Sequence, residues 1–366
     1  MSNFELSMDT NSVHHWDIPQ AVREYIQNYL DNSQDSIWDY DPVSEVLTLT
    51  NRNTSLPRRV FLHGNSSKQG DNSTRGQYGD GIKSALAVLL REGVKVTFLN
   101  AGLVWEPKIS YSETFQAEVI SIDEYEFGVD CEDFTVKIKG ITPNTFEEVV
   151  TNTLPFQDDL GEMITTSKGN ILKDPRFAGR IYSGGVFVCH FSTKYGFDIN
   201  VGELPLDRDR KAVDNFQLRW LTKDMWGEVA GQDDEESAKT VMTSLKSNDS
   251  SIDFLSSAVP KVSPALTQAA EDTYKADYKD TLVTSSHEEF NALHKAGNKV
   301  SLVKNEGLVK IIQQTSEYKT FSLGAKKVKT IEEVLDEFKD EWQNEMSIEL
   351  LDAFEDLCED ILDTKN

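Results

Sequence analysis

The stretch that decides the fold is residues 21–32, which read AVREYIQNYLDN. At about 100° per residue, a helix over this stretch places Glu24, Asn28 and Asp31 within about 40° of one line. An apolar stripe runs beside that line and consists of Val22, Ile26, Tyr29 and Leu30. We therefore expect a half-buried helix with a polar edge, and the alternative is a surface helix whose polar spacing has no function.

The polar edge combines a carboxylate with a carboxamide one turn later. A carboxylate in the position of Glu24 can hold a water molecule near an ion that the amide oxygen of Asn28 binds. Metal-assisted hydrolysis of a phosphoanhydride needs a water molecule held near a bound ion in this way. The spacing therefore favours a hydrolytic site on this helix.

The composition describes an acidic globular protein. The chain has 366 residues, enough for two domains, and a formal net charge of −25. This charge disfavours direct binding to a nucleic-acid duplex, while an acidic surface that imitates nucleic acid or docks on a basic partner remains an alternative. No apolar run reaches the ~18 residues of a membrane span, and the first residues lack the features of a signal peptide. Three widely spaced cysteines predict no disulfide framework, so we expect a cytoplasmic protein.

A second informative stretch is residues 75–93, RGQYGDGIKSALAVLLREG. Glycines at 76, 79 and 81 lead directly into an apolar helix that we expect to end at Gly93. Glycines allow the backbone to approach a ligand closely, and the amides of a helix N-terminus attract phosphate. Lys83, one turn into the helix, adds a cation. Taken alone, this pattern is a weak signal for phosphate binding.

The order of elements predicts an α+β sandwich. Residues 1–20 read as a polar lead-in that ends with Asp17 as a helix N-cap, and residues 57–75 read as a loop. Alternating apolar and β-branched residues predict strands, and a further helix is expected to begin near Thr145. The expected strands cover residues 44–50, 94–100, 108–112, 117–122, 134–141, 180–183, 186–190 and 197–200. This succession favours an antiparallel sheet with helices on one face.

The composition changes after Trp226, so we predict one domain over residues 1–225 and another over 226–366. The second region reads as mostly helical, with a small α/β piece over 281–318. Thr330 is a predicted N-cap for an amphipathic helix, and a second amphipathic helix follows Ser347. Their polar faces are dense with Asp and Glu, which indicates a solvated surface or a docking segment.

Taken together, these stretches resemble the ATP-binding fold shared by DNA gyrase, the ninety-kilodalton heat-shock chaperones, histidine kinases and MutL-type repair proteins. This group is the GHKL superfamily, and its nucleotide pocket is called the Bergerat fold. Its first motif, Glu-x-x-x-Asn-x-x-Asp, matches Glu24, Asn28 and Asp31. Its glycine motif, Gly-x-x-Gly-x-Gly, matches Gly76, Gly79 and Gly81, in a form similar to that of the chaperone and microrchidia-type branches. The resemblance covers residues 12–145 well and 146–220 loosely. It implies a Bergerat-type two-layer α/β sandwich.

One motif departs from the family. Where the family has Asp-x-Gly-x-Gly, with an aspartate that accepts a hydrogen bond from the adenine amino group, this chain has Asn51, Asn53 and Ser55. Asparagine is a neutral and weaker acceptor, so adenine selectivity is in question while nucleotide binding is still expected. Asn53 can adopt the left-handed backbone that a glycine would provide.

The resemblance implies roles for individual residues. Glu24 resembles the general base that deprotonates the attacking water, and Asn28 resembles the residue that holds Mg²⁺. Other residues implied in ATP binding are Asp31, Asn51, Gly76, Tyr78, Gly79, Gly81, Lys83 and Thr135. Arg208, Arg210 and Lys211 are weak candidates for a basic residue that reaches the terminal phosphate, and a salt-bridged loop is the favoured interpretation of this cluster.

The function that this resemblance implies is ATP binding and slow Mg²⁺-dependent ATP hydrolysis. Nucleotide would close a lid or drive an ATP-dependent homodimer that acts on a macromolecular partner, more readily a protein than nucleic acid. The carboxylate of Glu24 favours water over a kinase acceptor. The alternative is a non-enzymatic interaction protein with a degenerate pocket, an inhibitor or nucleic-acid mimic that acts through its acidic surface.

Overall fold

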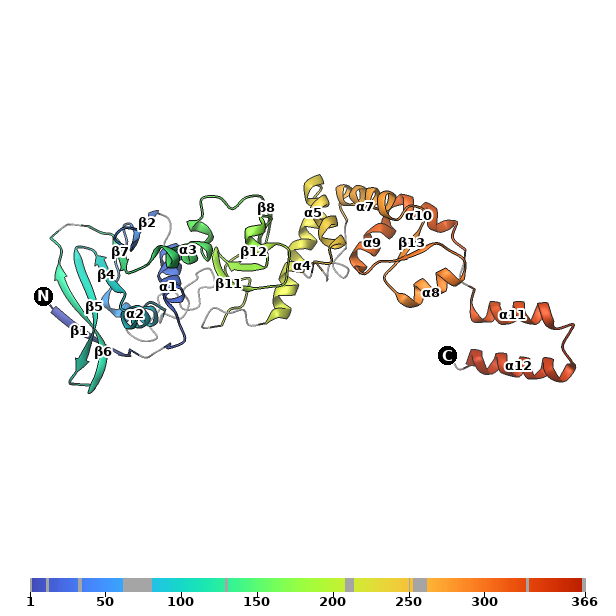
Figure 1. Cartoon of the computed structure of the whole chain (residues 1–366), viewed down its shortest axis with the longest axis horizontal. Helices are drawn as coiled ribbons and strands as arrows, with labels where there is room; N and C mark the ends of the chain where they lie inside the picture. Colours follow the sequence, from blue (N-terminus) through green and yellow to red (C-terminus); the bar gives the residue numbers. More distant parts are fainter. Residues whose placement is uncertain are drawn as a thin grey trace. The chain divides into compact units, whose positions relative to one another are not determined.

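The computed structural model describes residues 2–10, 13–31, 35–61, 81–128, 131–207, 214–249, 251–252, 262–326 and 329–363. The chain divides into two compact units, Met1–Leu221 and Thr222–Asn366. Figure 1 shows the elements of both units in the order of the chain. The predicted functional division at residues 225 and 226 stays a prediction, because compactness alone does not test independent domains.

The first unit contains a seven-stranded sheet in the order β1-β6-β5-β4-β7-β3-β2. Every neighbouring pair in it is antiparallel. Its strands are β1 (Ser2–Asp9), β2 (Ser36–Asp41), β3 (Val46–Asn51), β4 (Lys95–Asn100), β5 (Leu103–Ser112), β6 (Ala117–Glu126) and β7 (Phe134–Lys139). The mixed α+β class and the antiparallel sheet are therefore confirmed.

One face of this sheet packs against helices α1 (Ile18–Asp31) and α2 (Gly81–Arg91), and α3 (Pro143–Thr151) packs beside α1 (Figure 1). Alternate strand residues such as Leu49 and Phe98 are buried in one apolar core with Val22 and Ile26 of α1. Each such side chain contributes about 1.5–3 kcal/mol when it is fully buried. The two layers thus hold α1 and α2 side by side over the sheet.

The starts and ends of the helices follow local signals in the sequence. Asp17 caps α1, because its Oδ1 accepts a hydrogen bond from the backbone N–H of Gln20 at 2.9 Å. Helix α2 ends at Arg91, and Gly93 follows with a φ of +76°, a conformation that glycine adopts at little cost. Both predicted boundaries are confirmed.

The prediction of a polar lead-in over residues 1–20 was wrong, because residues 2–9 form β1. Phe4 pairs with Ile122 and Leu6 with Ile120 of β6, and Leu6 is buried. The intervening polar residues hid this alternation. Strand β2 was also missed, and it pairs with β3 along its whole length.

A second sheet completes the first unit, in the order β11-β10-β12-β9-β8. Strands β10 and β12 run parallel, and the other pairs are antiparallel. The strands are β8 (Met163–Thr166), β9 (Gly169–Leu172), β10 (Arg180–Ser183), β11 (Val186–His190) and β12 (Gly196–Ile199). The hairpin of β8 and β9 was not predicted, since each strand has only four residues.

The C-terminal unit is mostly helical, as predicted. Helix α4 (Asn215–Gly231) leads into it, and its further helices are α5 (Glu235–Lys246), α7 (Pro264–Asp277), α9 (Glu306–Gln314) and α10 (Ser316–Leu323). The predicted α/β piece is present as two parallel strands, β13 (Leu282–Thr284) and β14 (Val300–Leu302), joined by α8 (His287–Lys295). Two last helices, α11 (Ile331–Trp342) and α12 (Ile348–Asp363), follow.

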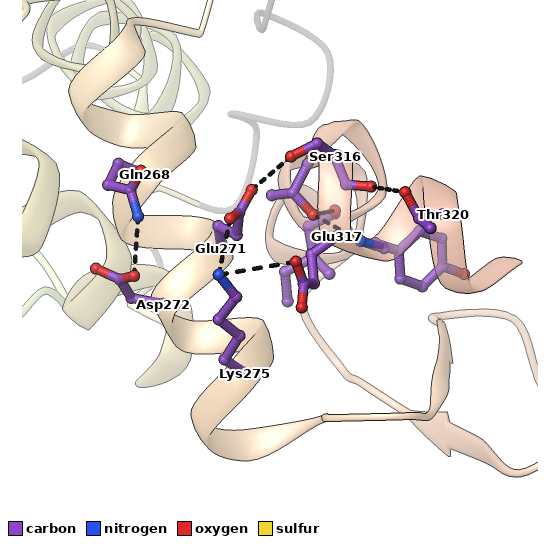
Figure 2. A network of polar contacts seen from close by, with 10 residues as sticks. Gln268, Glu271, Asp272, Lys275, Ser316, Glu317 and Thr320 are labelled. Atoms are coloured by element: carbon purple, nitrogen blue, oxygen red, sulfur yellow. Dashed lines mark hydrogen bonds and ion pairs between the residues drawn. The ribbon is translucent and has the colours of Figure 1, made fainter.

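A polar network joins α7 to α10 (Figure 2). Glu271 accepts hydrogen bonds from Lys275 at 2.9 Å and from Ser316 at 2.8 Å, and Lys275 also lies 3.7 Å from Glu317. The bond from Lys275 is the main cause that lowers the pKa of Glu271. Such partly exposed pairs each stabilise by only about 0–1 kcal/mol, so the buried ring pair of Tyr274 with Tyr318 carries more of this contact.

Within the part of the chain that the structure describes, no helix is both long and apolar enough to cross a membrane.

A buried carboxylate on β6 accepts hydrogen bonds from β1, from β5 and from Arg58. Glu124 on β6 is 7% exposed and accepts hydrogen bonds from Trp105 Nε1 and from Arg58 Nε, both at 2.8 Å. The hydroxyl of Ser2 on β1 donates a further bond at 3.1 Å. The bond from Arg58 is the main cause that lowers the pKa of Glu124, and burial opposes it. A carboxyl whose pKa is lowered on folding stabilises the folded state above its unfolded pKa of about 4.3, and this contribution is lost as the pH falls.

We expect Glu124→Gln to lower the melting temperature at pH 7, because the charged acceptor for Arg58 is lost. The deficit should shrink as the pH falls below about 4, where the wild-type carboxyl also becomes neutral. Thermal unfolding between pH 3 and pH 7 measures this, with Glu118→Gln at an exposed site on the same strand as the control. An equal deficit at both ends of the pH range would contradict the expectation.

Candidate functional site

The predicted base lies on α1 with little contact with solvent. Glu24 is 9% exposed, and its Oε1 lies 3.3 Å from Nη2 of Arg23. The guanidinium of Arg23 also lies over the ring of Trp16, 5.9 Å from the ring centroid. The carboxylate of Glu24 is therefore held on one side by a cation that is itself fixed on an aromatic ring.

The other side of this carboxylate contacts Gly81, the first residue of α2. An ideal Cβ built on Gly81 would lie 3.3 Å from Cδ of Glu24 and would overlap with Oε2. A side chain at position 81 would therefore displace the carboxylate of Glu24. A carboxylate beside a helix N-terminus also interacts favourably with the partial positive charge there. The structure thus brings the end of the glycine motif into direct contact with the predicted base.

Tyr25 stabilises the contact between α1 and the start of α2. Its hydroxyl donates a hydrogen bond to the backbone carbonyl of Ile82, the second residue of α2, at 3.1 Å. The side chain is 3% exposed, and burial raises the pKa of its hydroxyl. Sequence reasoning missed this positioning residue, and the available signal was a tyrosine directly after the predicted base.

Asn28 lies one turn after Glu24, as the spacing predicted. Its Nδ2 donates a hydrogen bond to the backbone carbonyl of Glu24 at 2.7 Å. Because that carbonyl can only accept, the amide nitrogen is turned toward the helix and the amide oxygen points elsewhere. Asp31, the third residue of the line, is partly buried at the end of α1.

Asn51 lies at the end of β3 and is 5% exposed. Its Nδ2 donates a hydrogen bond to the backbone carbonyl of Tyr29 on α1 at 3.0 Å. An aspartate at this position would place a carboxylate against that carbonyl, where neither group could donate. This bond gives a physical reason for the departure from the family motif. At Asn53 the backbone adopts a φ of +49°, so asparagine does supply the left-handed conformation there.

Two further polar side chains near this edge are buried. Lys83, on the first turn of α2, is 2% exposed. Gln27, directly before Asn28, is 1% exposed, and neither atom of its carboxamide has a hydrogen-bond partner in the described part of the chain. A buried amide without partners costs free energy that a bound polar ligand or water can recover. The buried amide of Gln27 therefore has unused hydrogen-bonding capacity for a bound water or polar ligand.

Thr135 does not join the other site residues, which corrects the prediction. It pairs with Thr50 in the register of β3 and β7, and the two hydroxyl oxygens lie 3.0 Å apart. Asn51 pairs with Phe134 instead. Neighbouring residues of a strand point to opposite faces, so Thr135 points away from the face that carries α1 and Asn51. The prediction followed the strand correctly but not the direction of the side chain.

Several predicted residues lie outside the described residues. They are Gly76, Tyr78 and Gly79 of the glycine motif and the basic cluster Arg208, Arg210 and Lys211. Their predicted roles stay predictions.

A cavity of about 190 Å³ lies along another side of α1. Its lining includes Trp16, Arg23 and Ile26 of the α1 region, Val149 of α3 and Phe187 of β11. It does not include Glu24, Asn28 or Asp31, so it is separate from the predicted site. Arg23 takes part in both, because it lines the cavity and contacts Glu24.

Comparison with protein-family models finds no match. An uncharacterized protein of Mycoplasma pneumoniae is 23% identical over 224 residues, which cover 56% of this chain and 88% of that protein.

Three solved structures are similar to part of this chain. The ATPase region of Saccharomyces cerevisiae topoisomerase II bound to dexrazoxane matches with a TM-score of 0.33 and 8% identity, over 47% of this chain and 63% of that chain. A second structure of the same region has a TM-score of 0.29 and 8% identity, over 47% and 61%. The ATPase and transducer domains of DNA topoisomerase II from Balamuthia mandrillaris have a TM-score of 0.28 and 12% identity, over 45% and 58%. This chain thus spans less than two thirds of each, and similarity at this level assigns no activity. The expected likeness to chaperone and microrchidia-type branches stays a prediction.

We expect Gly81→Ala to displace the carboxylate of Glu24, because the new Cβ overlaps with Oε2 at the end of this flexible side chain. A crystal structure of the variant measures the displacement. Gly231→Ala is the matched control, since a Cβ there would have no atom within 4 Å. A Glu24 carboxylate that keeps its position in Gly81→Ala would contradict the close contact.

We expect Asn51→Asp to cost about 1–3 kcal/mol, because the bond to the Tyr29 carbonyl is lost and a buried acceptor faces another acceptor. The same chemical change at Asn144, which is exposed on α3, should have little effect. Thermal unfolding of both variants at pH 7 checks this. If the two variants melt at the same temperature, the bond from Asn51 does not stabilise the fold.

Proposed function

We propose that this chain binds ATP in a Bergerat-type pocket of the GHKL superfamily and hydrolyses it slowly with the help of Mg²⁺. The observation that carries the proposal is the contact between Glu24 of α1 and Gly81 at the start of α2. These residues belong to two separate sequence motifs, and the fold makes them neighbours. Asn28 lies one turn along the same helix. The proposed pocket is the region around these three residues.

In this proposal Glu24 acts as the general base. Its carboxylate accepts a proton from a water molecule whose oxygen attacks the terminal phosphorus of ATP. The bond between that phosphorus and the bridging oxygen breaks, and ADP leaves with the electron pair, so the products are ADP and inorganic phosphate. General bases of this kind contribute about 10²–10⁴-fold to a rate. Arg23 and Gly81 hold the carboxylate in place.

Asn28 would hold Mg²⁺ through its amide oxygen, and the ion would neutralise charge on the phosphates. The backbone amides at the start of α2 would bind phosphate oxygens. Asn51 would accept a hydrogen bond from the amino group of adenine through its Oδ1, because its Nδ2 already donates to the backbone carbonyl of Tyr29. A neutral acceptor discriminates adenine from guanine less strongly than a carboxylate does.

The wider cycle is also a proposal. Nucleotide would close the segment around Gly76 and Gly79 over the phosphates and promote an ATP-dependent homodimer. A macromolecular partner, a protein rather than nucleic acid, would respond to this cycle, because the net charge of −25 disfavours a polyanion. We place the protein in the cytoplasm on the basis of its sequence.

The competing proposal is a non-enzymatic protein that acts through its acidic surface. The bond of Asn51 to α1 favours it, because that residue then has a structural reason to be asparagine without any nucleotide. The two proposals differ in whether Glu24 supports turnover.

We expect Glu24→Gln to lower ATP turnover at least a hundredfold, because an amide of the same shape cannot accept the proton. Affinity for a non-hydrolysable ATP analogue should change by only a few fold. Release of inorganic phosphate measures turnover, and calorimetric titration measures binding. Glu147→Gln, at an exposed position on α3, is the matched control and should retain both.

Turnover that is unchanged in Glu24→Gln would refute the role of Glu24 as base. An absence of both turnover and binding in the wild-type protein would favour the non-enzymatic proposal. Equal affinity for ATP and GTP analogues would support a nucleotide pocket but would contradict its selectivity for adenine.

A further inference from the structure

The last two helices form an antiparallel hairpin, which we call the C-terminal hairpin (residues 330–363). Thr330 and Glu333 form a capping box at the start of α11, in which each side chain bonds to the backbone N–H of the other residue. Phe338 of α11 packs against Phe354 of α12 with ring centroids 5.3 Å apart, and Lys339 forms an ion pair with Glu355 at 2.5 Å. The hairpin is therefore a defined element with its own side-chain contacts.

The apolar side of α11 remains half open. At about 100° per residue, its apolar side chains lie within an arc of about 100°. No residue of α11 is buried. The exposed fractions are 40% for Ile331, 50% for Val334, 46% for Phe338 and 42% for Trp342. Two helices are thus too few to cover this apolar surface.

Helix α12 also exposes large apolar side chains. Leu350 and Leu357 lie seven residues apart, so they share one side of the helix. They are 57% and 52% exposed, while Leu351 and Phe354 beside them are partly covered. Two large exposed leucines next to the pair of Phe338 and Phe354 form an apolar surface on which another helix can pack. We call this surface the apolar seam.

Charge indicates what kind of helix fits. Residues 331–363 contain 14 Asp and Glu against one Lys. These carboxylates flank the apolar seam on both helices. A helix that packs on the seam must pass between acidic borders, so one with Lys and Arg beside its apolar face is attracted and an acidic one is repelled.

We propose that the C-terminal hairpin binds a basic amphipathic helix of a partner protein and forms a three-helix bundle with it. The apolar face of the partner covers Val334, Leu350 and Leu357, and its Lys and Arg side chains lie against the acidic borders. A second copy of this chain is a poor occupant, since it would bring two strongly acidic segments together. This inference does not depend on the nucleotide pocket.

The probe is a fluorescent synthetic peptide of about 20 residues, made of Leu and Lys with helical apolar spacing. We expect saturable binding to the full-length protein in fluorescence anisotropy, weakened as NaCl rises from about 0.05 M to about 0.5 M. A peptide of the same composition with scrambled order tests whether an apolar face is needed. A Leu and Glu peptide with the same spacing tests the sign of the charge.

The variant Leu350→Gln with Leu357→Gln removes the exposed leucines without changing charge or helix propensity appreciably. We expect its affinity for the Leu and Lys peptide to fall at least tenfold, with an unchanged circular dichroism spectrum. Leu323→Gln is the matched control, because Leu323 is 89% exposed on α10 and lies outside the hairpin. It should bind the peptide as the wild type does.

Equal binding of the scrambled peptide, or full affinity in the double variant, would overturn the proposal, because binding would then be general attraction between charges. A wild-type dimer in light scattering that the double variant dissolves, together with no peptide binding, would assign the seam to a second copy and would also overturn it.

Discussion

The contact between the carboxylate of Glu24 and the backbone of Gly81 is the constraint on which the proposed site depends. It forms because position 81 has no side chain to displace the carboxylate and because the core of the sheet holds α1 against α2. The hydroxyl of Tyr25 adds a bond from α1 to the carbonyl of Ile82, 57 residues further along the chain. Apolar burial, one partly buried hydrogen bond and an absent Cβ therefore bring one carboxylate to one helix N-terminus.

The bond from Asn51 to the carbonyl of Tyr29 connects the sheet to the same helix. It gives the asparagine a structural role that an aspartate could not fill, because two acceptors would face each other. In the proposed pocket, the Nδ2 of Asn51 stabilises the contact with α1, and its Oδ1 is the proposed acceptor for adenine. A change at this residue that affects nucleotide selectivity is expected to affect the fold as well.

Sequence reasoning was most successful where a local signal determines the outcome. The cap at Asp17, the stop at Gly93 and the N-cap at Thr330 depend on neighbouring residues, and all three are present. It failed where partners far along the chain decide. Strand β1 forms because it pairs with β6. Tyr25 has a positioning role because its hydroxyl donates a hydrogen bond to the first turn of α2. Thr135 was placed on the right strand, but the register with β3 turns its side chain to the other face.

Calorimetric titration of the full-length protein with a non-hydrolysable ATP analogue, with and without Mg²⁺, tests the proposed pocket most directly. We predict saturable binding at one site per chain that weakens when Mg²⁺ is removed, and that weakens similarly in Asn28→Ala, because the amide oxygen of Asn28 is the proposed ligand. Binding that depends neither on Mg²⁺ nor on Asn28, or no binding at all, would contradict a nucleotide site on α1.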